Sequence, residues 1–208
     1  MKVAAITLTY NRLDLTKRTI ESFQDKTKVD FHLFVDNNST DGTQEWLQDK
    51  HRILLDKNYG IANAFTVGVR SLMDQDNYDY ILKLDNDIET VTPNIIERML
   101  EFYRLNGDNF VASPTDLLLD PNYAPRSFGV RDMKGFKVEF VTHTGGAFQL
   151  IPFKACKLLC DQFVAFSQGD YAIGPFFLSK GYKPIYLRDL EMRHIGLNLS
   201  TPGNEYVM

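Results

Sequence analysis

The chain has little of several things, and each shortage excludes a class of protein. Its 208 residues include two cysteines and one tryptophan, and no apolar run is long enough to cross a bilayer. Two cysteines cannot staple a small secreted scaffold. The apolar start from Met1 to Thr9 lacks the cleavage pattern of a signal peptide. These absences predict a cytoplasmic protein without a transmembrane segment.

The two cysteines themselves give no sign of a site. Cys156 and Cys160 are four residues apart in a segment with helical periodicity, where a disulfide has poor geometry. No further cysteine and no nearby histidine accompanies them, so we expect two buried thiols rather than metal ligands.

Positive charge is not concentrated anywhere along the chain. The formal net charge is −4, with 23 Lys and Arg against 27 Asp and Glu, and no basic cluster resembles a nucleic-acid footprint. Nucleic acid is therefore not an expected partner. The length and the 44% hydrophobic content allow one substantial core, which predicts a single domain over residues 1–208.

The first half alternates short β-rich runs with helical patterns, which is typical of βαβ units and a mostly parallel sheet. The predicted strands are 3–9, 31–35, 52–55, 80–84 and 110–112, and the predicted helices are 13–23, 40–47, 60–73 and 93–105. Prolines and glycines over 113–135 predict a long irregular excursion. Beyond it we expect strands at 137–142, 147–151 and 184–187, helices at 153–160 and 170–180, and a polar tail.

Polar side chains follow each of the first four predicted strands. Open α/β sheets bind ligands at the carboxyl ends of their strands. The groups there are Thr9-Tyr10-Asn11-Arg12, Asp36-Asn37-Asn38-Ser39, Asp56 to Gly60, and Asp85-Asn86-Asp87. So many carboxylates and amides at one edge predict a binding rim.

In order and spacing, these segments resemble the inverting glycosyltransferases of family 2 with the GT-A fold. The resemblance also takes in Thr40 to Thr43, Asn63, Gly145-Gly146, Gly169-Asp170 and His194. It implies a Rossmann-like three-layer α/β/α sandwich with a mixed, mostly parallel sheet. It further implies a nucleotide-binding half over 1–112 and an acceptor-binding half over 113–208.

Asp85-x-Asp87 matches the DxD motif of that family. The resemblance implies that Asp87 ligates Mn²⁺ or Mg²⁺ against the donor diphosphate and that His194 completes the coordination. A hard cation with oxygen ligands is suited to neutralising a diphosphate. In isolation, the same three residues could instead form a turn that caps the next helix.

The resemblance assigns the nucleotide to the ends of the first strands. Asp36 would accept a hydrogen bond from the base, for which uridine is the first candidate, and Thr9, Asn11 and Arg12 would lie beside base and ribose. Asp41 is expected to cap a helix. The remaining predicted nucleotide-binding residues are Tyr10, Asn38, Ser39, Asn58, Gly60, Asn63, Asp85 and Asn86.

The acceptor side is predicted from the second half of the chain. By resemblance, Asp170 takes the proton from the acceptor hydroxyl, although Gly169 stands where relatives commonly have Glu. An Asp at a helix start can also be a plain cap. Gly145 and Gly146 would let the backbone approach the sugar or acceptor closely.

The expected function is metal-dependent, inverting transfer of a sugar from a nucleotide-diphosphate sugar to a saccharide or other hydroxyl acceptor. Two alternatives remain open: a sugar-nucleotide pyrophosphorylase, and a non-catalytic nucleotide-sugar binding module suggested by Gly169. A homo-oligomer or a docking partner is compatible with the sequence.

Overall fold

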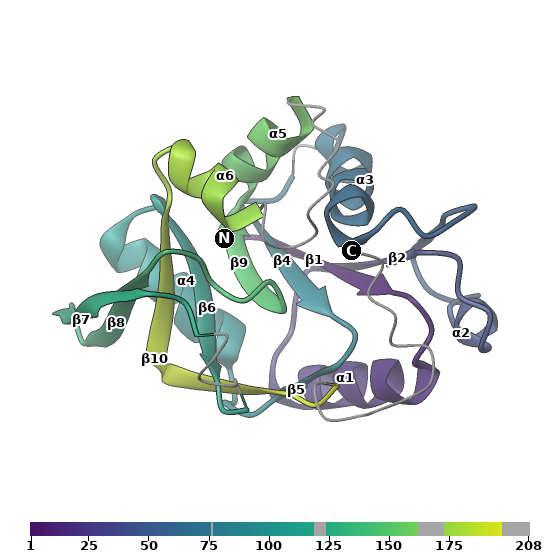
Figure 1. The fold of residues 1–208 in the computed structure, drawn as a ribbon, viewed down its shortest axis with the longest axis horizontal. Coiled ribbons are helices and arrows are strands. Elements are labelled where there is room, and N and C mark those ends of the chain that lie inside the picture. The colour runs from purple at the N-terminus through teal and green to yellow at the C-terminus, as the bar shows by residue number, and fades with distance from the viewer. Residues whose placement is uncertain (76, 119–123, 162–172, 197–208) are drawn as a thin grey trace.

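The structure is a computed structural model that describes residues 1–75, 77–118, 124–161 and 173–196 (Figure 1). Its strands are β1 Val3–Thr9, β2 Phe31–Asp36, β3 Arg52–Leu54, β4 Tyr80–Asp85, β5 Ile88–Thr90, β6 Phe110–Asp116, β7 Ser127–Met133, β8 Phe136–Val141, β9 Phe148–Pro152 and β10 Lys183–His194. Its helices are α1 Leu13–Lys26, α2 Thr43–Trp46, α3 Ile61–Met73, α4 Ile95–Asn106, α5 Phe153–Asp161 and α6 Ile173–Ser179.

The strands form one mixed sheet in the order β3-β2-β1-β4-β9-β6-β10-β8-β7, with β5 paired to the end of β10. The segment β3-β2-β1-β4 is parallel throughout. Strand β9 runs antiparallel between β4 and β6, and β10 is parallel to β6. The carboxyl ends of β1, β2, β4, β6 and β10 therefore lie at the same edge of the sheet.

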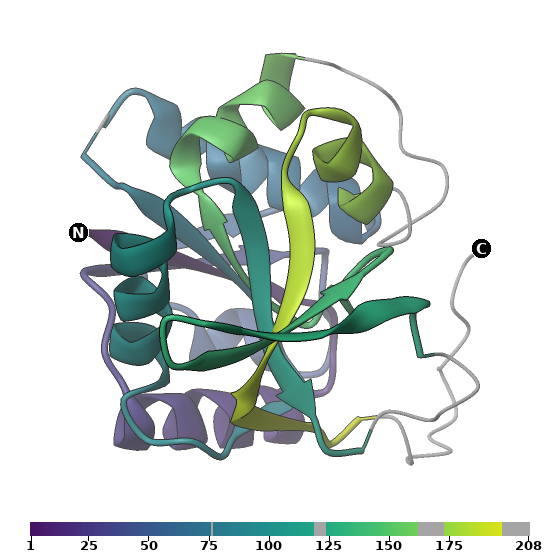
Figure 2. The ribbon, with the colours of Figure 1, turned by 90° about the vertical axis from the view of Figure 1, so that its left-hand side faces the viewer.

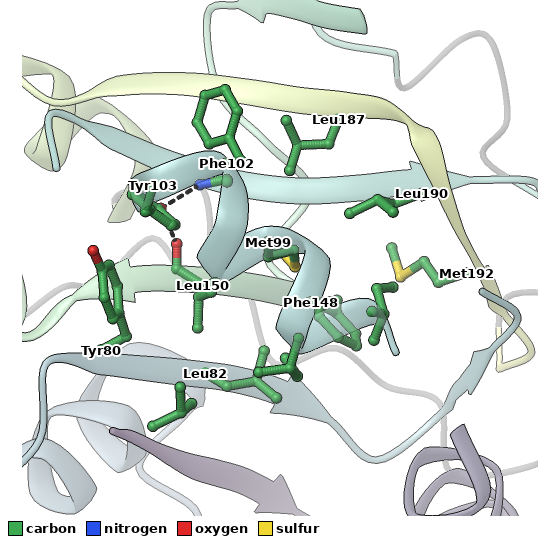
Figure 3. Close-up of a cluster of buried hydrophobic side chains, with 14 of the residues drawn as sticks. Tyr80, Leu82, Met99, Phe102, Tyr103, Phe148, Leu150, Leu187, Leu190 and Met192 are labelled. Atoms are coloured by element: carbon green, nitrogen blue, oxygen red, sulfur yellow. Dashed lines mark hydrogen bonds between the residues drawn. The ribbon is translucent and has the colours of Figure 1, made fainter. Parts of the chain in front are cut away.

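Helices cover both faces of this sheet. Helices α1 and α4 pack on one face, and α3, α5 and α6 pack on the other (Figures 1 and 2). On β4, Tyr80 and Leu82 face the first layer and Ile81 the second, because side chains alternate along a strand. Tyr103 of α4 is buried there, donates to Leu150 O at 2.6 Å, and accepts from Ala112 N at 3.3 Å (Figure 3). The predicted three-layer α/β/α architecture is confirmed.

The predicted irregular excursion over 113–135 is wrong for residues 113–116 and 127–133, which form strands. Strand β6 continues to Asp116, and β7 pairs antiparallel with β8 in a hairpin at the left edge of Figure 1. Strand β7 is an exposed edge strand in which Phe128 and Val130 are more than half exposed. Because β7 has no buried face, its sequence lacks the alternation that identifies a strand.

Two further strands depart from the prediction. Strand β10 runs to His194 rather than ending at Leu187, since its pairing shifts register between Leu187 and Glu191 and then continues along β6. Strand β5, which was not predicted, pairs with the last residues of β10. His194 is therefore the last residue of β10 and does not lie in a loop that follows the strand.

The remaining expectations about the chain concern thiols and helices. Cys156 and Cys160 are buried and form no disulfide, as predicted, and burial raises the pKa of the Cys156 thiol well above its ordinary value. Within the described residues, no helix combines the length and apolar character needed to span a membrane.

Candidate active site

The turn after β4 carries the DxD residues and is anchored on α1. Asn86 donates from Nδ2 to Thr16 Oγ1 at 3.0 Å and to Asn11 O at 3.2 Å. Ile88 N donates to Thr19 Oγ1 at 2.9 Å. These bonds use threonines on the buried face of α1, so the helix fixes how the turn presents Asp87.

Asp87 is almost fully buried and both of its carboxylate oxygens are engaged. Arg12 Nη1 lies 2.7 Å from Oδ2, and His194 Nε2 lies 3.1 Å from Oδ1. Burial alone would raise the pKa of Asp87, but the hydrogen bond from His194 and the charges of His194, Arg12 and Lys83 hold it below its ordinary value. Burial lowers the pKa of His194, but the hydrogen bond to Asp87 and the charges of Asp87, Asp85 and Asp116 together raise it above its ordinary value.

The donor atoms near Asp87 include two that suit a divalent cation. A carboxylate and an imidazole that converge at the same edge of the sheet are a donor pair suited to Mn²⁺ better than to Mg²⁺. Among the described residues, no group of three or more His, Cys, Asp or Glu gathers closely enough to hold a metal alone. Within the part of the chain that the structure describes, Asp87 and His194 are the candidate pair, and a metal held there would need further ligands.

The chain beyond β10 crosses directly over Asp87. Ile195 N donates to Asp87 O at 2.8 Å, and a Cβ at Gly196 would lie 2.1 Å from Asp87 Oδ2. Only glycine fits there without displacing the carboxylate. Because position 196 has no side chain, the backbone can pass close to Asp87 Oδ2.

Lys83 is a site residue that the sequence analysis missed. Its side chain is fully buried in β4, and Nζ lies 2.6 Å from Asp85 Oδ1 and 2.6 Å from Gly146 O. The ammonium group therefore joins the first carboxylate of the DxD motif to the glycine pair. A lysine inside the apolar run 80–84 was the available signal, because a buried lysine requires a partner.

Asp36 and Thr9 lie side by side at the ends of β2 and β1, as their parallel register requires. Asp36 is fully buried and accepts from Thr9 Oγ1 at 2.7 Å, from Ser39 N at 2.8 Å and from Ser39 Oγ. Gln44 Nε2 donates to Asp36 Oδ2 at 3.0 Å. A carboxylate has about four acceptor positions, so a nucleobase that bonds Asp36 has to replace one of these donors.

The loop after β1 holds Arg12 in an uncommon conformation. Asn11 and Arg12 both have positive φ, 54° and 61°. Asn11 N donates to Ser39 Oγ at 2.7 Å, and Asn11 Oδ1 accepts from Thr40 N at 2.8 Å. Two consecutive non-glycine residues in this region are strained, and such strain persists where surrounding contacts impose it.

Asp41 bonds the first residue of two helices, of which the sequence predicted only the one that follows it. It accepts from Thr43 N at 3.1 Å at the start of α2, and from Leu13 N at 2.8 Å at the start of α1. Burial opposes a low pKa for Asp41, but its hydrogen bonds lower it.

The other predicted nucleotide-binding residues have mainly local contacts. Asn58 Oδ1 accepts a hydrogen bond from Gly60 N at 2.8 Å, and Gly60 directly precedes α3. Asn63 Nδ2 donates to Tyr59 O at 2.9 Å. Tyr10 is 44% exposed at the end of β1, and Asn38 is an exposed residue with φ 68°. The structure brings Thr9, Arg12, Asp36, Ser39 and Asn86 into contact networks around β1, and leaves Asn58 and Asn63 at the start of α3.

The glycine pair is held from two sides. Gly145 N donates to Tyr186 Oη of β10 at 2.9 Å, and Gly146 O accepts from Lys83. Burial raises the pKa of Tyr186. The predicted base Asp170 and the neighbouring Gly169 lie outside the described residues.

This three-layer α/β/α sandwich, with carboxylates at the ends of its parallel strands, matches the GT-A fold. The sequence model described as glycosyl transferase family 2 matches residues 4–150, which is more than half of the chain. The chain belongs to glycosyl transferase family 2.

Solved structures share this fold at low sequence identity. S. aureus TarS superimposes with a TM-score of 0.67 at 16% identity, over 92% of this chain and 36% of that one. GalNAc-T7 with UDP, GalNAc and Mn²⁺ gives 0.74 at 12%, over 99% and 46%. The mannosyltransferase PcManGT from Pyrobaculum calidifontis, in complex with GDP-Man and Mn²⁺, gives 0.66 at 16%, over 99% and 58%.

The chain thus spans between about a third and three fifths of the length of these structures. No curated protein matches it in sequence.

Proposed function

We propose that the protein is a metal-dependent inverting glycosyltransferase that moves a sugar from a nucleotide-diphosphate sugar to an acceptor hydroxyl. The observation that carries the proposal is the pairing of Asp87 with His194 at the edge where β1, β2 and β4 end. Membership of family 2 supports a transferase over the pyrophosphorylase.

Asp87 and His194 would hold the cation, with Mn²⁺ favoured by the imidazole. When bound, such a cation neutralises the negative charge that develops on the departing diphosphate. Burial of Asp87 beneath Gly196 keeps water from its carboxylate and strengthens its electrostatic interactions.

The reaction is a single displacement at the anomeric carbon. The bond from that carbon to the diphosphate oxygen breaks and its electron pair leaves with the nucleotide, while the acceptor oxygen bonds to the opposite face. The acceptor's proton passes to the Asp170 carboxylate, the role that the resemblance assigns to this position.

UDP-sugars are the first donors to test. Thr9 and Asp36 form the part of the rim that would meet the base, and the structural neighbours were solved with UDP in one case and GDP-Man in another. Guanosine and thymidine donors belong in the same screen.

The experiment is a thermal-shift and calorimetric screen of UDP-, GDP- and dTDP-sugars with and without Mn²⁺, run on wild type and Asp87→Ala. We expect at least one donor to bind in a Mn²⁺-dependent way, and the substitution to abolish that dependence. Asp49→Ala is the matched control, because this carboxylate is 80% exposed and belongs to no rim strand. Wild-type affinity in Asp87→Ala contradicts the assignment.

Turnover separates the enzyme from the binding module. Donor binding without hydrolysis or transfer, across a panel of saccharide acceptors, would favour the module that Gly169 suggests.

A further inference from the structure

The DxD carboxylates are already neutralised by basic side chains of the same chain. Asp85 pairs with Lys83 at 2.6 Å and Asp87 pairs with Arg12 at 2.7 Å. The rim is therefore not a bare acidic cluster awaiting a cation. A cation that binds Asp87 has to compete with a guanidinium group.

The two basic residues differ in their freedom to move. The Lys83 side chain is fully buried and also bonds Gly146 O. The Arg12 side chain is 25% exposed and reaches Asp87 from the strained loop after β1. Contacts of Asn11 with Ser39 and Thr40 hold the backbone of the loop, so a change of partner by Arg12 is a movement of its side chain and not of the loop.

We infer that Arg12 is an exchangeable counter-ion, which neutralises Asp87 in the ligand-free protein and passes to the donor's diphosphate when the nucleotide binds. This inference rests on the proposed function and gives Arg12 a partner other than the base and ribose. Its transfer leaves Asp87 Oδ2 without its guanidinium partner, so that this oxygen can bind a cation.

The chemistry of the guanidinium group favours this exchange. Its planar fork matches phosphate oxygens in a two-point hydrogen bond, and it remains charged at every relevant pH. Without a diphosphate, a cation at Asp87 would displace Arg12 and leave two positive groups close together. With a diphosphate, both positive groups have an anionic partner.

The consequence is positive coupling between nucleotide and metal. Each should bind more tightly in the presence of the other, and by linkage the factor is the same in both directions. Removing the guanidinium group should make the metal bind more tightly alone and should shrink the coupling.

The test measures free Mn²⁺ by electron paramagnetic resonance during titration of the whole protein, with and without UDP and GDP. Protein-free titrations correct for Mn²⁺ held by the nucleotide alone. The variants are Arg12→Met, which keeps side-chain length without charge, and Arg12→Lys, which keeps the charge. Arg18→Met is the matched control, because Arg18 is an exposed residue of α1.

In wild type and Arg18→Met, we expect nucleotide to tighten Mn²⁺ binding on the order of tenfold. Arg12→Met should bind Mn²⁺ alone about tenfold more tightly than wild type, with clearly smaller coupling and weaker nucleotide binding. Arg12→Lys should restore part of the coupling.

Two results overturn the inference. If Arg12→Met keeps the wild-type coupling and Mn²⁺ affinity, Arg12 does not exchange, and the proposed function stands. If wild type binds no Mn²⁺ with either nucleotide, the inference and the metal-dependent function both fail.

Discussion

Asp170 carries the residue-scale prediction about chemistry. Asp170→Asn should lower kcat by roughly 10²–10⁴, because an amide cannot accept the acceptor's proton. Mn²⁺-dependent nucleotide affinity in the same preparation should stay within about twofold of wild type. The reason is that Asp170, as the proposed catalytic base, would contact the acceptor and not the donor diphosphate. Unchanged turnover would remove Asp170 from the mechanism.

The ion pair of Lys83 is expected to stabilise the folded protein. Lys83→Met keeps the side-chain volume but leaves Asp85 without its ammonium partner, which should cost roughly 3 kcal/mol of unfolding free energy in urea. Adding Asp85→Asn should recover part of that loss, because the unpaired carboxylate is gone. A single variant as stable as wild type would show that the ion pair contributes nothing.

At the scale of elements, β2 contains His32, which lies next to β1. Its protonation makes the free energy of unfolding depend on pH. His32 stacks on Phe34 with ring centroids 4.5 Å apart, and Thr7 Oγ1 lies 2.8 Å from its Nε2. Burial lowers the pKa of His32 from about 6.5 to about 4. Between these values the unfolded chain binds a proton that the folded protein excludes, so this contribution to stability is complete above pH 6.5 and is lost as the pH falls toward 4.

This predicts a difference between wild type and His32→Phe. On lowering the pH from about 7 to about 5, wild type should lose about 2 kcal/mol more unfolding free energy than the variant, because phenylalanine cannot titrate. Urea unfolding at both values measures it. Equal losses in the two proteins would show that His32 is protonated as easily folded as unfolded.

The elements also show what the sequence can and cannot predict. Helices and buried strands of the first half follow strong periodicity, and their chain order places Thr9, Asp36 and Asp87 at one edge. The pairing of Arg12 with Asp87 joins residues 75 positions apart and leaves no local pattern. The exposed strand β7 also has no local sequence pattern that would identify it.

The sequence also did not predict the hydrogen-bond donors around Asp36. Ser39 is near it in the sequence, but Thr9 reaches it from a neighbouring strand, and Gln44 reaches it from the first turn of α2. Such contacts depend on how elements pack, which periodicity alone does not determine.

At the scale of the whole molecule, the fold extends further than the recognisable family sequence. The family match ends at residue 150, whereas the structural superpositions cover 92–99% of the chain. The part beyond residue 150 includes β10, which brings His194 to Asp87. Packing constraints on this strand are met by many sequences, so shape persists where sequence similarity fades.

Strand β10 touches the candidate site at two places, through Tyr186 at the glycine pair and through His194 at Asp87. From Gly146 the path returns through Lys83 and Asp85 to the same turn, so the contacts form a closed mechanical linkage. A shift of one member therefore alters the geometry of the contacts next to it. A small molecule bound against the glycines is expected to disturb the contact between His194 and Asp87, the proposed metal ligands, without touching either residue.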